Sequence, residues 1–160
     1  MTGCAPVQFT VPFAPVAWQR AGVTLTNQGP KHYTPEQTRA WKDIVAVYAR
    51  RAMAGVEPFA GAVKLELAFH VAIPKSWPSW KREAANRGEI APTVKPDLDN
   101  FEKAVKDALN EIAWRDDAQV VKASKEKAYS FRPGVAITIT PLSLLPAQVS
   151  RRPQCGEQHV

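Results

Sequence analysis

Cysteine and histidine are scarce in this chain of 160 residues. The two cysteines, Cys4 and Cys155, lie near opposite ends, and the three histidines (His32, His70 and His159) are scattered. No cysteine pair has the spacing of a zinc site, and two cysteines cannot build a disulfide framework. A single bond between the two terminal regions is the alternative to free thiols. We expect a protein of the reducing cytoplasm.

Long apolar runs are also absent, so the sequence predicts no segment that crosses a bilayer. Residues 1–6 carry neither a basic region nor an apolar stretch, and we expect no signal peptide. The hydrophobic fraction of 45% and the charged fraction of 22% are typical of a globular protein, and the length is that of one domain.

Acidic residues are outnumbered by basic ones, 15 against 21, which gives a net charge of +6 and an isoelectric point of about 9.5. A positive surface suits a polyanionic partner, nucleic acid first and an acidic membrane surface second. The alternative is a modest charge that only aids solubility. No basic amphipathic helix supports the membrane partner.

Apolar periodicity predicts six regular elements in the order β-α-β-α-β-β. They are a strand at 7–11, a helix at 35–54, a strand at 63–73, a helix at 97–113, and strands at 119–129 and 135–140. Thr34 is the expected N-cap of the first helix, and a turn at 132–134 predicts a hairpin of the last two strands. We expect an α+β domain over 1–140, with a mixed sheet and helices packed on one face, and a tail at 141–160.

The stretch between the third and fourth elements is long, basic and contains two tryptophans, Trp77 and Trp80. A short helix is expected at 80–86. Alternating basic and aromatic residues are typical of nucleic-acid surfaces. A solvated loop docked by its tryptophans is the alternative. The residues predicted to contact DNA are Lys75, Lys81, Arg82, Arg87 and Lys95.

Three carboxylates flank the second helix: Asp97 and Asp99 at its start, and Asp117 in the loop after its end. Helix capping alone could account for the first two. It does not account for Asp116 and Asp117, because adjacent acids are unfavourable near the negative end of a helix. Converging carboxylates would need a hard cation, Mg²⁺ or Mn²⁺. Lys103, one turn beyond Asp99, could pair with it or offset charge in a phosphoryl transition state.

The same stretch resembles the RusA family of Holliday-junction resolvases, which are crossover-junction endodeoxyribonucleases. The resemblance covers roughly 6–140 and is most specific over 95–121. It is carried by KPDLDN at 95–100, KAV at 103–105, DALN at 107–110 and WRDDAQVV at 114–121. Upstream, FHVAIPKSW at 69–77 and KRE at 81–83 also resemble the family, and YTP at 33–35 and the first strand do so more loosely.

The resemblance implies that Asp97, Asp99 and Asp117 bind Mg²⁺ (Mn²⁺ being the alternative), that Lys103 is the catalytic lysine, and that Asp116 has a supporting role. It also implies an α+β homodimer that resolves four-way junctions by paired nicks in opposed strands. A nuclease for other branched DNA and a non-catalytic junction-binding protein of the same fold are the alternatives. Family members often have Asn-Gly where this chain has Asn110-Glu111. The resemblance therefore does not fix the residue at which the helix ends or how Asp117 is presented.

Overall fold

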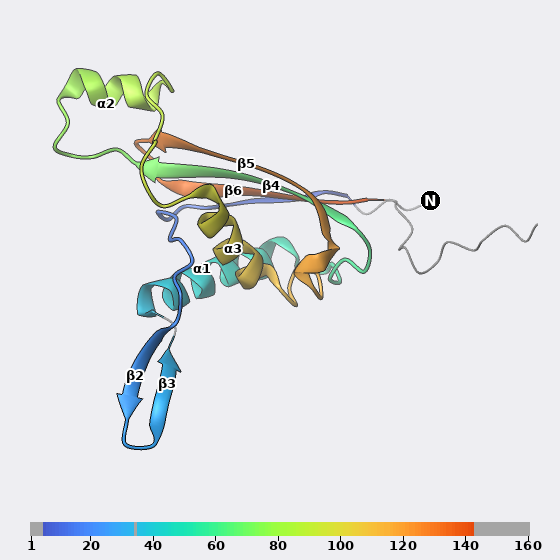
Figure 1. The fold of residues 1–160 in the computed structure, drawn as a ribbon. Helices are drawn as coiled ribbons and strands as arrows, with labels where there is room; N and C mark the ends of the chain where they lie inside the picture. The colour runs from blue at the N-terminus through green and yellow to red at the C-terminus, as the bar shows by residue number, and fades with distance from the viewer. Residues whose placement is uncertain (1–4, 34, 143–160) are drawn as a thin grey trace, which may run out of the picture.

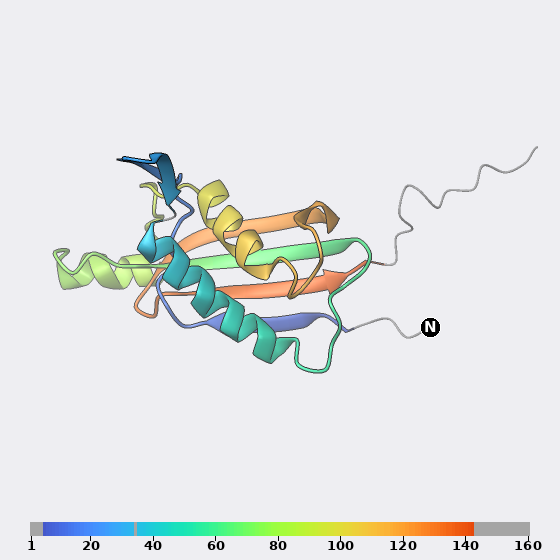
Figure 2. The ribbon, with the colours of Figure 1, turned by 90° about the horizontal axis from the view of Figure 1, so that it is seen from below.

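A four-stranded mixed sheet supports the fold, and two helices cover one of its faces (Figures 1 and 2). The computed structural model describes residues 5–33 and 35–142. Their elements are β1 (Val7–Val11), β2 (Gly22–Thr26), β3 (Gly29–Tyr33), α1 (Glu36–Ala52), β4 (Val63–Ala72), α2 (Ser79–Asn86), α3 (Leu98–Leu109), the 3₁₀ turn η1 (Asp117–Gln119), β5 (Val120–Ser130) and β6 (Gly134–Pro141). This confirms a single α+β domain with a mixed sheet.

Strict alternation in β4 sets the two faces of the sheet. Leu65, Leu67 and Phe69 are buried, while the residues between them are half-buried on the other face. Because successive strand residues point to opposite faces, the apolar set lies against α1 and α3. The Phe69 ring stacks on Phe101 of α3 with centroids 5.0 Å apart. Full burial of such a side chain stabilises the fold by about 1.5–3 kcal/mol.

The predicted hairpin of the last two strands is wrong, because β4 lies between them. The sheet order is β1-β6-β4-β5, with β4 parallel to β5 and antiparallel to β6. Side-chain composition explains the order. Val135, Ile137 and Ile139 of β6 are fully buried, which suits an inner strand, whereas β5 is largely exposed. Charged side chains favour an edge position.

Residues 22–33 form a second, two-stranded sheet that is not among the six predicted elements. Strands β2 and β3 pair antiparallel around a tight turn in which Gly29 has a φ of 110°. The Thr26 hydroxyl donates to the Gly29 carbonyl at 2.7 Å and accepts from the Gln28 amide at 3.3 Å. Figure 1 shows this hairpin projecting from the body beside the start of α1.

Helix boundaries differ from the predicted ones at several ends. Helix α1 covers Glu36–Ala52, and its expected cap Thr34 lies outside the described residues, as do all but the first two residues of the expected tail. Helix α2 is confirmed and begins one residue early. Helix α3 ends at Leu109 because Glu111 adopts a φ of 67°, which a continuing helix cannot accommodate. Among residues 5–33 and 35–142, no helix has the length and apolar character needed to cross a membrane.

Candidate active site at the start of helix α3

The turn before α3 is held by a lysine from β5. Lys127 Nζ donates to the carbonyl of Val94 at 2.7 Å and to that of Pro96 at 3.0 Å. The Lys95–Pro96 peptide bond is cis. Asp97 follows as the N-cap residue, in an extended conformation, but its exposed side chain makes no capping hydrogen bond. The Asp97 carboxylate is therefore presented to solvent rather than used by the helix.

Asp99, in the first turn of α3, belongs to a charged network that sequence reasoning missed. Lys125 Nζ of β5 contacts both Asp99 Oδ1 and Glu102 Oε2. The second carboxylate oxygen of Glu102 accepts from Lys106 Nζ at 2.7 Å. Glu102 is buried, with 9% of its surface exposed. Two ammonium groups compensate its charge, which a buried carboxylate requires.

This network shifts the pKa of each central group. The hydrogen bond from Lys125 lowers the pKa of the exposed Asp99 carboxyl, and the same contact raises the pKa of Lys125. Burial raises the pKa of Glu102, but the hydrogen bonds from Lys106 and Lys125 together outweigh it, so the net shift is downward. All of these groups are therefore charged near neutral pH.

Lys103 is exposed on the next turn of α3 and lies over an aromatic ring. Its Nζ is 3.5 Å from the ring centroid of Trp18, a cation–π contact. The Trp18 amide donates to the Asn100 carbonyl at 2.9 Å, which fixes the ring against α3. Among the described residues, the partner of Asp99 is thus Lys125 and not Lys103, contrary to the pairing that helix spacing suggested.

Asp117 lies in η1, at the far end of α3. The loop that carries it is well hydrogen-bonded: Asp116 Oδ1 accepts from the Ala118 amide at 2.8 Å, as the N-cap of η1. Gln119 Oε1 accepts from the Arg115 and Asp116 amides, and its Nε2 donates to the carbonyls of Phe59 and Gly61 at 2.6 and 2.9 Å. The Asp117 side chain itself is exposed.

One copy of the chain does not gather the three predicted carboxylates. Helix α3 has 12 residues and spans about 18 Å. Along β5, the contact of Asp99 with Lys125 lies five residues, about 16 Å, beyond the start of the strand that follows Asp117. Figure 1 shows the two sites at opposite ends of α3. No group of three acidic, histidine or cysteine side chains in the described part of the chain is placed to hold a metal ion. Asp97 and Asp99 lie at the same end of α3, and Asp117 is separate from them.

The basic residues predicted to contact DNA lie on and around α2, which extends beyond the end of the sheet (Figure 1). Lys75 and Lys95 are exposed. Lys81 Nζ lies 4.0 Å from the Trp77 ring centroid, and Arg82 lies 5.7 Å from that of Phe131. Arg87 is paired with Glu89 at 2.9 Å, which offsets its charge.

The two tryptophans of this segment have different roles. The Trp77 ring packs edge-on against Tyr129 of β5, with centroids 5.3 Å apart. Trp80 is 69% exposed. Of the two tryptophans, Trp77 therefore helps to dock the segment onto the body, and Trp80 remains an exposed aromatic surface beside the basic residues.

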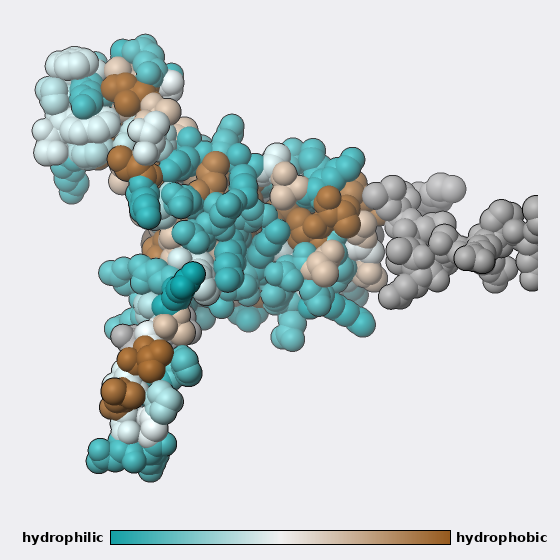
Figure 3. Space-filling model, viewed as in Figure 1, coloured by the Kyte–Doolittle hydropathy of each residue, from teal (hydrophilic) through white to brown (hydrophobic). Residues whose placement is uncertain are grey.

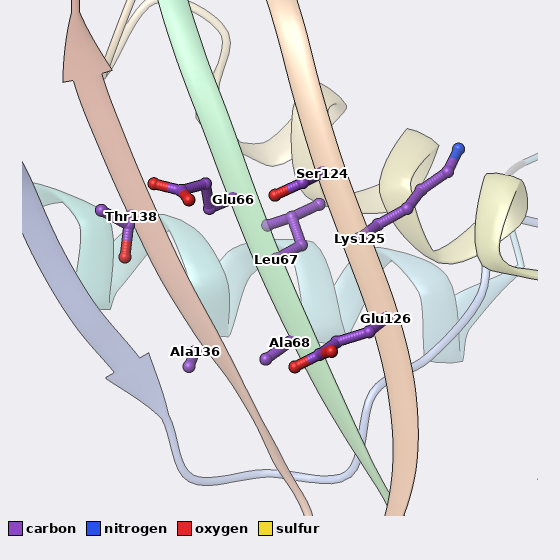
Figure 4. Close-up of a pocket in the computed structure, with 8 residues that line it drawn as sticks. All are labelled: Glu66, Leu67, Ala68, Ser124, Lys125, Glu126, Ala136 and Thr138. Carbon is purple, nitrogen blue, oxygen red and sulfur yellow. The ribbon is translucent and has the colours of Figure 1, made fainter. Parts of the chain in front are cut away.

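A hollow of about 280 Å³ lies on the helix-free face of the sheet, away from these groups. In Figure 4, Glu66, Ser124, Glu126 and Thr138 line this face, while Lys125 extends toward α3. The two carboxylates come from neighbouring strands, β4 and β5. The hollow is therefore distinct from the start of α3.

Lys125 and Lys127 had a signal in the sequence. Residues 121, 123, 125, 127 and 129 of β5 share one strand face, and their neighbours in β4 include the buried Leu67 and Phe69. Two lysines on an otherwise apolar strand face indicate that the helices covering this face provide hydrogen-bond acceptors for their ammonium groups. Strand periodicity alone could have placed them near α3, but their partners come from the tertiary fold.

Comparisons with known proteins identify the family of the chain. A sequence model of the family described as Endodeoxyribonuclease RusA matches residues 12–140. The chain is also 34% identical, over 139 residues, to the uncharacterised protein YqaN of Bacillus subtilis (strain 168). That alignment covers 86% of this chain and 97% of YqaN. The matched region contains α3, η1 and the whole candidate site.

Proposed function

Because the chain belongs to the RusA endodeoxyribonuclease family, we propose that it is a metal-dependent nuclease that resolves four-way DNA junctions by paired, symmetric nicks. The observation that carries the proposal is the exposed start of α3. There Asp97 is the N-cap residue, Asp99 lies in the first turn and Lys103 lies one turn beyond it, inside the region that the family matches. An exposed pair of carboxylates beside a lysine suits phosphodiester chemistry.

The side chains at this end of α3 fit a hard divalent cation. Carboxylate oxygens are the donors that Mg²⁺ and Mn²⁺ prefer, and the Asp97 carboxylate makes no capping hydrogen bond. Lys125 Nζ contacts Asp99 Oδ1, so a bound ion would share this carboxylate with the ammonium group. We propose Asp97, Asp99 and Asp117 as the metal ligands. A bound ion would lower the pKa of a coordinated water and polarise the phosphoryl group.

The roles of the remaining side chains follow from their positions. Lys103 is exposed and held over the Trp18 ring, so its ammonium group can offset negative charge on the phosphate or on the leaving oxygen. Lys125 keeps Asp99 oriented and deprotonated. Lys127 fixes the backbone of the turn on which Asp97 is presented.

We further propose that the missing Asp117 comes from a second copy of the chain in a homodimer. Strand β5 is at the edge of the sheet, and residues 121–124 at its beginning are exposed. If two copies align antiparallel along this edge, the η1 end of one lies beside the α3 start of the other, because a two-fold axis reverses the strand direction. Such a dimer has two composite sites, as paired nicks require.

The basic segment around α2 is proposed to grip the DNA backbone. Lys75 and Lys95 are exposed at its two ends, and Lys81, Arg82 and Arg87 lie between them. Contacts of lysine and arginine with phosphates position DNA without reading its sequence. We therefore expect recognition of junction shape, with the charge of Arg87 reduced by Glu89.

The proposal is tested by a cleavage assay on a four-way junction labelled on each strand in turn, with and without Mg²⁺. Asp97→Asn, Asp99→Asn, Asp117→Asn and Lys103→Ala should each bind the junction and fail to nick it. Asp43→Asn, an exposed aspartate on α1, is the matched control and should cut normally. Undiminished cutting by the site variants would remove these residues from the mechanism.

Two alternatives give different results in the same assay. Faster cleavage of flaps or forks than of four-way junctions would indicate a nuclease for other branched DNA. Purified wild-type protein that binds junctions but nicks no branched substrate with Mg²⁺ or Mn²⁺ would indicate a non-catalytic binding protein.

A further inference from the structure

The hairpin of residues 22–33, which we call the arm, is the described segment that stands farthest from the sheet (Figure 1). One face of the arm is apolar. Val23 and Leu25 are two residues apart in β2 and so share that face, and they are 55% and 84% exposed. Their cross-strand partners are His32 and Pro30. Figure 3 shows apolar side chains exposed along the arm.

This exposure is unfavourable for an arm that acts alone. A single two-stranded hairpin is at best marginally stable in water, and apolar side chains gathered on a projecting element mark a binding surface. The opposite face of the arm, with Thr24 and Lys31 as a cross-strand pair, is polar. The asymmetry indicates that the face of Val23 and Leu25 is the one that meets a partner.

The base of the arm is attached to the candidate active site. Three residues separate β2 from Trp18, whose amide donates to the Asn100 carbonyl in the first turn of α3. The ammonium group of Lys103 also makes its cation–π contact with the Trp18 ring. A substrate held at the start of α3 would therefore lie within reach of the arm.

The positive charge around the arm favours DNA over a second copy of the chain as its partner. No aspartate or glutamate precedes Glu36 in the sequence, whereas Arg20 and Lys31 flank or lie on the arm. In the proposed homodimer the second copy lies along β5, whereas the arm is a separate sheet that this pairing does not use. A nucleic acid would attract the arm, and its bases would offer flat apolar faces to the exposed side chains.

We propose that the arm enters the branch point of the DNA junction and packs Val23 and Leu25 against base faces that the branch leaves unstacked. This inference rests on the proposed function and adds a recognition element to it. A two-stranded ribbon has dimensions that fit a DNA groove, and apolar side chains act as wedges between bases in other DNA-binding proteins. Because Lys103 lies over the Trp18 ring at the base of the arm, the bound arm would fix where the branch point lies relative to Lys103.

The test compares Leu25→Ser and Val23→Ser with two matched controls, Val56→Ser, an exposed valine elsewhere, and Thr24→Ser, on the polar face of the arm. Binding is measured by fluorescence anisotropy in metal-free buffer, on a four-way junction and on linear duplex of the same sequence. A 2-aminopurine base at the branch point reports unstacking. Leu25→Ser should weaken junction binding about tenfold, because a leucine loses its apolar burial.

Three further results are expected of Leu25→Ser. The 2-aminopurine signal on binding should disappear, duplex binding should not change, and circular dichroism should show an intact fold, because the side chain is exposed. The controls should behave as wild type. Unchanged junction binding and an unchanged 2-aminopurine signal, with wild-type protein that does bind junctions, would overturn the role of the arm and leave the proposed function intact.

Two other outcomes also overturn the inference. A smaller particle mass for Leu25→Ser in light scattering, with normal binding per protomer, would show that a second copy covers the arm. Wild-type protein that does not prefer the junction to duplex would refute the proposed function itself, and the inference with it.

Discussion

The separation of Asp117 from Asp97 and Asp99 leads to a prediction that can be tested without a structure of the complex. Oxygen ligands lie about 2.1 Å from Mg²⁺, so carboxylates that share one ion have donor oxygens within about 4 Å of each other. Helix α3 separates the two groups by about 18 Å. A site within one copy does not bring these oxygens within about 4 Å, whereas the proposed site between two copies can do so.

The perturbation is a mixture of two inactive proteins, Asp97→Asn and Asp117→Asn. In a mixed dimer with composite sites, one site receives both substitutions and the other receives neither. Free exchange of equal amounts makes about half of the dimers mixed, each with one intact site of two, so nicking should recover to about a quarter of the wild-type rate. The products should be singly nicked junctions rather than resolved duplexes.

The assay uses co-expressed or co-refolded proteins and a junction labelled on opposed strands. The control mixes Asp97→Asn with Asp99→Asn. These positions lie at the same end of α3, so every composite site in a mixed dimer contains one inactivating substitution. No nicking activity should therefore return. No recovery in the first mixture, or equal recovery in the control, would refute the composite site.

The other predictions concern stability and the charged network. Glu111→Gly should raise the free energy of unfolding by about 1 kcal/mol, because glycine relieves the cost of a φ of 67°, and should raise the melting temperature by about 3 °C in calorimetry. Lys125→Met should lower the unfolding free energy in urea by about 1–2 kcal/mol, because Glu102 keeps only its contact with Lys106. The lowered pKa values of Asp99 and Glu102 mean that their contribution is complete above about pH 4.5 and is lost as the pH falls through the folded-state pKa.

Each of these results has a clear contradiction. An unchanged or lower melting temperature for Glu111→Gly would show that the Glu111 side chain stabilises the turn. Equal urea midpoints for wild type and Lys125→Met would show that the ammonium group contributes nothing net. The pH effect requires wild type to lose more stability than Lys125→Met between pH 6 and 3, and parallel curves would contradict it.

The local patterns of the sequence predicted most of the elements but not how they are arranged. The alternation from Val63 to Phe69 identified the central strand, and the apolar stripe with Phe101 and Leu109 identified α3, because both depend on short-range periodicity. Strand order depends on long-range pairing. The turn at 132–134 suggested a hairpin, but burial of Ile137 and Ile139 puts β6 inside the sheet.

The candidate site shows the same limit. The motif at 95–103 correctly placed Asp97, Asp99 and Lys103 at one helix start, since residues within two turns of a helix cannot separate. The spacing of the acidic residues in the sequence could not predict the path of the chain after α3, and so could not place Asp117. The sequence also gave no indication that Gly29 and Pro30 belong to a hairpin, because both residue types are common in loops as well.

Lys125 and Lys127 tie the outermost strand to the acidic turn, and this has a mechanical consequence. The two side chains act as struts from β5 to Asp99 and to the backbone at Pro96. A lateral displacement of β5 would therefore move the Asp99 carboxylate and the backbone that carries Asp97, through these polar contacts rather than through the hydrophobic core. In the proposed homodimer, pairing along β5 would therefore affect the position of Asp99 and of the turn before α3.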